Sequence, residues 1–273
     1  SVYNNTATLY GGGARVWGKL VSMDTYSDIS DNCAPHGGGV SLFDGTLVLN
    51  AGDMEDNEAA ATDAKGGGIH AAGGQILLTD NAWIYHSKAY DGAGIYADGA
   101  TIDFGKGVLG GNTASHDGGG AYLIHGSAMT TTHLTEIGRT SYPNAARYGG
   151  GIYLDSSRLM FEGSIAQNTA SGRGGGIAAM AASDLTIARA VLQLNTAVGY
   201  GGGIYAQDSH LSVHHSRMHR NVGVRGGAIS QEGAGAVADL SNTLIYSNTS
   251  TAGVGTGVRS EGGSVTMTHV TLA

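Results

Sequence analysis

The sequence predicts an all-β parallel β-helix, a solenoid of about ten coils with roughly 27 residues and three short strands in each coil. Three observations predict it. Clusters of glycine recur along the whole chain, as in "NTAVGYGGGIYA" from Asn195 to Ala206. The clusters return at a nearly constant interval, and alternating apolar residues follow them. Repeats of about 20 to 50 residues are typical of solenoids, in which each unit buries its apolar side against its neighbours.

The composition agrees with strands and turns. The chain has 273 residues, of which 48 are glycine and only 2 are proline, so a collagen-like helix is excluded. Apolar residues make up 41% of the chain, which is too many for a disordered linker. Each interior glycine costs an α-helix roughly 1 kcal/mol relative to alanine, so no long helix is expected.

The apolar residue that closes each glycine cluster marks one unit of the repeat. Successive marks are 25 to 31 residues apart, with a mean near 27. No domain boundary is therefore expected, and residues 1–273 are predicted to form a single β-helix domain. Because the chain opens and closes inside a unit, we expect it to be a fragment of a longer surface protein. The ten marks are Ala14, Val40, Ile69, Ile95, Ala121, Ile152, Ile177, Ile204, Ile229 and Val258.

Each unit contains three candidate strands. The first starts at the mark and alternates apolar with polar or aromatic residues, the pattern of a strand with one buried face. A second alternating run follows, and a third short strand ends in the pattern apolar-x-x-Asn. The second runs are Leu47/Leu49, Ile76/Leu78, Ile102/Phe104, Leu159/Phe161, Leu185/Ile187, Leu211/Val213 and Val265/Met267. The asparagines are Asn32, Asn57, Asn112, Asn168, Asn195, Asn221 and Asn248.

Glycine and asparagine have structural explanations. Where the chain turns from the asparagine into the next unit, a positive φ angle or a close approach of stacked backbones would exclude a Cβ atom, and Gly202 is expected to be such a position. Asparagine suits a left-handed corner. Stacked asparagines can pass hydrogen bonds from one side-chain amide to the next.

The apolar-x-x-Asn tetrapeptide paired with Gly-Gly-Ala/Ile/Val resembles the repeats of chlamydial polymorphic outer membrane proteins and of other large bacterial surface proteins. "MHRN" to Asn221, followed by "GGAI" ending at Ile229, is the best single match. The sequence departs from that family in preferring three glycines to two. The resemblance implies a right-handed β-helix, an extracellular or cell-surface location on a bacterium, and an adhesin-like or scaffold role like that of an autotransporter passenger.

Charge and apolar runs limit the partners. The net charge is −8, and residues 1–136 carry 5 basic and 15 acidic side chains, whereas residues 137–273 carry 9 and 7. Nucleic acid is not an expected partner, because phosphate binding needs a basic face. No apolar run approaches the roughly 18 residues of a membrane span. The expected partners are a glycan or the surface of a host or neighbouring cell, flanking domains of the same chain, and further copies joined through the terminal coils.

The sequence favours a non-catalytic protein over an enzyme. Signatures of polygalacturonases, such as Asn-Thr-Asp and Gly-His-Gly, are absent, and "NTA" recurs where "NTD" would be needed. The alternative is a polysaccharide lyase or hydrolase of the pectin-lyase-like class. Its candidate catalytic residues would be Asp98, Asp155 and His70.

No cofactor is expected, although one acidic stretch offers oxygen ligands of the kind that Ca²⁺ prefers. The spacing of its carboxylates matches neither an EF-hand nor the nonapeptide calcium repeat, so a solvated acidic loop is the simpler interpretation. The candidate ligands are Asp53, Glu55, Asp56, Glu58 and Asp63.

The position after each mark points outward and gives the candidate ligand-binding residues Tyr96, Tyr122, Tyr153 and Tyr205. The first three should stack on consecutive coils at about 4.8 Å and face solvent. With His70 at one end and Asp98 and Asp155 close by, such a strip could bind a glycan. Stacked tyrosines also stabilise parallel sheets by cross-strand pairing, so a purely structural strip is the competing interpretation.

Overall fold

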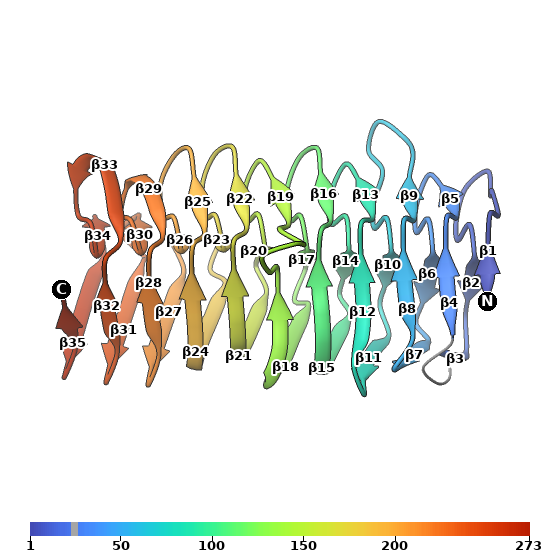
Figure 1. Ribbon diagram of the computed structural model, residues 1–273, viewed down its shortest axis with the longest axis horizontal. Coiled ribbons are helices and arrows are strands. Elements are labelled where there is room, and N and C mark those ends of the chain that lie inside the picture. Colours follow the sequence, from blue (N-terminus) through green and yellow to red (C-terminus); the bar gives the residue numbers. More distant parts are fainter. Residues whose placement is uncertain (23–26) are drawn as a thin grey trace.

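The computed structural model describes residues 1–22 and 27–273, and these wind through about ten turns of a parallel β-solenoid (Figure 1). The turns lie side by side along the long axis, with the two chain ends at opposite ends of the stack. Three parallel sheets run along this axis. Among the described residues, no helix is long and apolar enough to cross a membrane.

The ten marks lie in register in one ten-stranded sheet, which confirms the predicted period and phase. Ile177 pairs with Ile204, and Ile204 pairs with Ile229. All three side chains are fully buried. In order, the strands are β2 (Ala14–Val16), β6 (Val40–Phe43), β10 (Ile69–Ala72), β14 (Ile95–Asp98), β17 (Ala121–Ile124), β20 (Ile152–Asp155), β23 (Ile177–Met180), β26 (Ile204–Gln207), β30 (Ile229–Glu232) and β34 (Val258–Glu261).

The second alternating runs form a seventeen-stranded sheet whose inward residues pack against those of the ten-stranded sheet. In four central turns the chain passes through this sheet as one long strand, and in most others as two. Its strands are β1 (Val2–Tyr3), β3 (Lys19–Ser22), β4 (Asp28–Ser30), β7 (Thr46–Asn50), β8 (Asp53–Glu55), β11 (Gln75–Thr79), β12 (Ala82–Tyr85), β15 (Thr101–Gly110), β18 (Ala128–Ile137), β21 (Arg158–Ala166), β24 (Asp184–Gln193), β27 (His210–His214), β28 (Arg217–His219), β31 (Val237–Ser241), β32 (Leu244–Tyr246), β35 (Ser264–Thr268) and β36 (Thr271–Leu272).

The predicted third strand is placed differently in the structure. The segment that ends in asparagine belongs to the seventeen-stranded sheet, and the third sheet forms only after the asparagine. In "NTA", Thr113 is exposed and Ala114 is buried, which is the alternation of a short strand. The nine strands are β5 (Cys33–Ala34), β9 (Glu58–Ala59), β13 (Lys88–Ala89), β16 (Thr113–Ala114), β19 (Ala145–Ala146), β22 (Thr169–Ala170), β25 (Thr196–Ala197), β29 (Val222–Arg225) and β33 (Thr249–Val254).

The predicted asparagine ladder is confirmed. The side-chain amide of Asn168 donates to the side-chain oxygen of Asn195 at 3.0 Å, and Asn195 donates in the same way to Asn221 at 3.0 Å. Asn144 also belongs to the ladder, accepting from Asn112 at 3.1 Å. The sequence pattern missed Asn144 because its unit is the longest and lacks the apolar-x-x-Asn spacing. One turn breaks the ladder, because Ser87 takes the place of asparagine.

The left-handed corner lies one residue earlier than predicted. Leu194 and Arg220 have φ angles of 58° and 56°, whereas the asparagines that follow them do not have positive φ. The turn is therefore made before the asparagine, and its side chain stays inside the stack, where Asn195 and Asn221 are fully buried.

The glycine triplet uses two different properties of glycine. Gly201 has a φ of +67°, the left-handed conformation. Gly202 does not, so of the two expected reasons for glycine there, the close approach of stacked backbones applies and the positive φ does not. A Cβ atom on Gly202 would instead lie 2.4 Å from the carbonyl oxygen of Val222, because β29 of the nine-stranded sheet passes against it. The triplet thus lets the third sheet lie close to the corner.

Candidate functional site

The predicted aromatic ladder exists on the outer face of the ten-stranded sheet. The rings of Tyr96 and Tyr122 stack with centroids 5.3 Å apart, and those of Tyr122 and Tyr153 with centroids 4.7 Å apart. His70 extends the ladder, 5.6 Å from Tyr96. The strip therefore spans four consecutive turns.

The expectation that these rings face solvent is wrong. Only 3% of Tyr96 and 8% of Tyr153 are exposed, Tyr205 is fully buried, and Tyr122 is half-buried. Burial raises the pKa of each of these phenols. Residues that precede a glycine cluster lie over two of these rings: Nζ of Lys65 is 4.9 Å from the ring centroid of Tyr96, and the guanidinium carbon of Arg173 is 4.9 Å from that of Tyr205. The rings present little surface to a ligand, which favours the structural interpretation of the strip.

The candidate catalytic residues do not form one site. The imidazole Nδ1 of His125 lies 2.8 Å from a carboxylate oxygen of Asp98, and Asp155 accepts a hydrogen bond from Ser156. Asp98 pairs with Ile124 in the next turn, and Asp155 lies one turn further on, so about 10 Å of sheet separates the two carboxylates. The geometry does not support an acid–base pair of Asp98 and Asp155.

His70 is instead part of an aromatic cluster near the N-terminal end. Its ring lies 5.5 Å from that of His36 and 5.9 Å from that of Tyr10, and its Nδ1 is buried without a hydrogen-bond partner among the described residues. Burial, with smaller contributions from His36 and Lys65, lowers the pKa of His70 to about 4.

This low pKa predicts a pH-dependent stability. The folded state disfavours protonated His70. The free energy of unfolding is therefore highest above the ordinary pKa of 6.5 and decreases as the pH falls toward about 4. The decrease in the free energy of unfolding that is attributable to His70 should reach about 3 kcal/mol. Denaturant melts at several pH values should show it, and His70→Phe, which keeps an aromatic ring but cannot titrate, should reduce it. An equal pH dependence in both proteins would contradict this origin.

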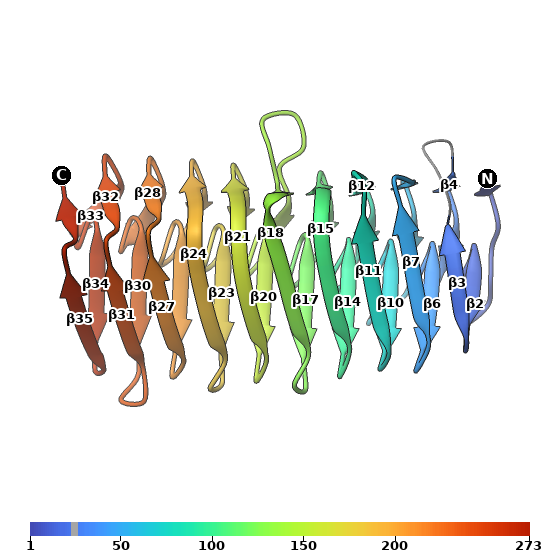
Figure 2. The ribbon, with the colours of Figure 1, turned by 90° about the horizontal axis from the view of Figure 1, so that it is seen from below.

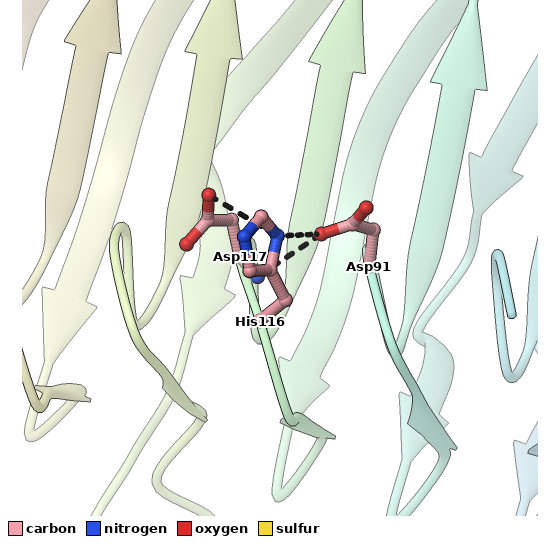
Figure 3. A group of neighbouring side chains, drawn as sticks. All are labelled: Asp91, His116 and Asp117. Atoms are coloured by element: carbon pink, nitrogen blue, oxygen red, sulfur yellow. Dashed lines mark hydrogen bonds and ion pairs between the residues drawn. The ribbon is translucent and has the colours of Figure 1, made fainter. Parts of the chain in front are cut away.

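The structure brings together a cluster that was not identified from the sequence. Asp91, His116 and Asp117 come from two neighbouring turns, and the imidazole lies between the two carboxylates (Figure 3). Nδ1 of His116 is 2.8 Å from Asp91 and 3.4 Å from Asp117. Asp91 and Asp117 both directly precede a glycine cluster, 26 residues apart, so the period could have revealed them.

Among the described residues, this is the one group of three potential metal ligands, with its ligand atoms within 4.8 Å of one another. Arg147 of the next turn, however, donates two hydrogen bonds to Asp117, at 3.1 and 3.0 Å. Such bidentate charge-assisted bonds are strong, and a cation would have to displace the guanidinium. We therefore assign the cluster as an ion-pair network that joins three turns.

The acidic stretch does not form one loop as predicted. Asp53 and Glu55 lie on β8, Asp56 makes the left-handed corner with a φ of 51°, Glu58 lies on β9, and Asp63 lies in the turn that leads to the glycines. Asp53 and Glu55 share the outward face of β8, but two strands and a corner lie between the first and last carboxylate of the stretch, so the five residues do not form one loop.

A groove on the outer face of the seventeen-stranded sheet was also missed. Its floor follows one column of outward residues in successive turns, from Asp53 through Trp83, Val108 and Glu136 to Ser164. Two cavities of about 420 and 250 Å³, which share Asn81 and Trp83, form the groove. Strands about 4.8 Å apart make this column roughly 20 Å long.

One side of the groove is formed by the loop between β18 and β19, which projects from the stack (Figure 2). This loop accounts for the additional residues of the longest repeat unit. Its Tyr142 packs edge-on against Trp83, with ring centroids 5.9 Å apart, and the guanidinium of Arg139 lies 5.5 Å from the centroid of Trp83. Lys106 adds positive charge further along the groove, and Arg189, which also lines it, forms an ion pair with Glu162.

The fold defines the protein as a parallel β-solenoid whose outer faces carry a buried aromatic strip and an open groove. Comparison of the chain with known protein families, with characterised proteins and with solved structures finds no significant match.

Proposed function

We propose that the protein is a non-catalytic, extracellular bacterial β-solenoid that binds an extended glycan along the groove over Trp83, in the manner of an adhesin. The observation that carries the proposal is the groove itself. It runs along the solenoid axis, and Trp83 is half-buried in its floor, packed against Tyr142. Aromatic rings suit the apolar faces of sugars, and the neighbouring polar groups can bind hydroxyls.

The supporting architecture is rigid. Trp83 lies on β12 between Asp53 of the preceding turn and Val108 of the following turn, so parallel strands fix its backbone on both sides. Glu136 and Arg139 form an ion pair at 3.6 Å beside it, and both side chains remain partly exposed to solvent. A linear polymer would therefore meet a preorganised surface, which reduces the entropy cost of binding.

An enzyme is the second candidate, and one observation favours it. Asp53 borders Trp83, and burial together with the nearby Glu55 and Asp28 raises the pKa of its carboxyl group. Carboxyl groups with a raised pKa in a cleft are candidates for general acids. An assay for reducing ends and unsaturated sugars separates the two functions. Our proposal expects no turnover, whereas turnover that disappears in Asp53→Asn would establish the enzyme.

Trp83→Ala tests the binding proposal. A glycan array would first identify a ligand, and calorimetry would then measure its affinity. The variant should bind about tenfold more weakly, since removal of a stacking aromatic residue costs on the order of 1 kcal/mol or more. Trp17→Ala is the matched control, because Trp17 is an exposed tryptophan that directly follows β2, outside the groove. A silent array, or equal losses in both variants, would refute the proposal.

A further inference from the structure

Three arginines surround the ring of Tyr200 on the outer face of the ten-stranded sheet, near its C-terminal end. The guanidinium carbons of Arg173, Arg225 and Arg259 lie 5.1, 5.6 and 5.0 Å from the ring centroid. Arg173 and Arg225 precede the glycine clusters of the turns on either side of Tyr200, and Arg259 lies on β34. We call these four residues the arginine cage.

The cage is only partly neutralised. Glu232 accepts hydrogen bonds from Arg259 at 2.8 Å and from the hydroxyl of Tyr205 at 2.7 Å, and it lies 3.6 Å from Arg173. The arginine and tyrosine contacts outweigh burial and lower the pKa of Glu232, so this carboxylate stays charged. Arg259 also pairs with Glu261.

Arg225 is the arginine of the cage that has no acidic partner among the described residues. It is exposed, and its guanidinium has no hydrogen bond or ion pair with any residue that the structure describes. Three guanidinium groups face two carboxylates, so the cage has one uncompensated positive charge on a protein whose net charge is −8. The local charge therefore opposes that of the whole chain.

The cage opens onto a cavity of about 480 Å³ with a mainly polar lining. Arg225 and Arg173 provide donors there, Glu232 and the more exposed Glu261 provide acceptors, and the amide of Gln207 provides both. The lining suits a ligand that carries one negative charge and several hydroxyl groups, and the volume suits a small molecule or one unit of a polymer.

We infer that the arginine cage binds a carboxylate-bearing sugar, with the carboxylate on Arg225 and the hydroxyls on Gln207 and Glu232. A carboxylate has one negative charge, which matches the single uncompensated charge, and its two oxygens match the fork of a guanidinium. A phosphate, with nearly two charges, would leave an excess of negative charge. The inference does not depend on the groove over Trp83, which lies on a different sheet.

The sugar could be free or part of a polymer, and calorimetry separates the two sources. Glucuronate and an oligomer of galacturonate are the probes, and glucose is the neutral control. We expect saturable binding of the uronates that weakens as salt is added, and no binding of glucose. Tighter binding of the oligomer would indicate a polymer, and equal binding would indicate a free sugar acid. Absence of saturable uronate binding would overturn the inference, as would sulfate binding as tightly as glucuronate.

Arg225→Ala should weaken uronate binding by about tenfold. Its melting temperature should stay close to that of the parent, because Arg225 has no ion pair to lose among the described residues. Arg217→Ala is the matched control, since Arg217 is an exposed arginine on β28 of the seventeen-stranded sheet. Trp83→Ala should leave uronate binding in the cage unchanged, which separates this test from that of the groove. Unchanged affinity in Arg225→Ala would contradict the assignment.

Discussion

Ile204→Asp should destabilise the solenoid by about 4 kcal/mol or more, and part of the stack should unfold. Ile204 is fully buried and lies in the column between Ile177 and Ile229. An aspartate there would be either charged without solvation or protonated without a hydrogen-bond partner, and both states are costly. Circular dichroism and denaturant melts measure the effect.

Met160→Asp is the control for this variant. Met160 lies on β21, half of it is exposed, and it points away from the core. The same new charge should change the free energy of unfolding by less than about 0.5 kcal/mol, because water can solvate it. Comparable melts for the two variants would mean that the assignment of inward and outward residues is wrong.

Gly202→Val should destabilise the protein by about 3 kcal/mol through backbone contact. The new Cβ would lie 2.4 Å from the carbonyl oxygen and 2.5 Å from the carbonyl carbon of Val222, and 2.6 Å from the carbonyl oxygen of Gly227. None of these atoms belongs to a flexible side chain, so relief requires the third sheet to move away from the corner. The thermal melting midpoint should fall accordingly.

Gly18→Ala provides the comparison, because a Cβ at Gly18 would meet no atom within 4 Å and its φ is not positive. We expect little change in melting for this variant. If Gly202→Val melted like Gly18→Ala, the close packing of the nine-stranded sheet against the glycine triplet would not be required for the fold.

Much of the fold was predictable because it repeats. In a parallel solenoid, equivalent residues of successive turns must stack, so the period determines which side chains pair. The marks from Ala14 to Val258 pair as predicted, and so do the asparagines from Asn168 to Asn248. The stacking of Tyr96 on Tyr122 follows from the same argument.

The candidate site was less predictable because its burial depends on contacts within a turn. The alternation of apolar residues correctly predicts that Tyr96 and Tyr153 lie on the outer face of their sheet. Their exposure to solvent was inferred from this position alone. The segment that enters each glycine cluster brings residues such as Asp91 close to these rings. The period of 27 residues does not show how far that segment folds over the face.

The sequence by itself determined the repeat, the register between turns and the columns of stacked residues, because these follow from periodic burial. Only the tertiary structure decided how the three sheets meet at their corners. The loop with Tyr142 forms one side of the groove over Trp83, and the close approach of β29 requires glycine at position 202. These features depend on angles between sheets and on one irregular unit, and neither is encoded in the average repeat.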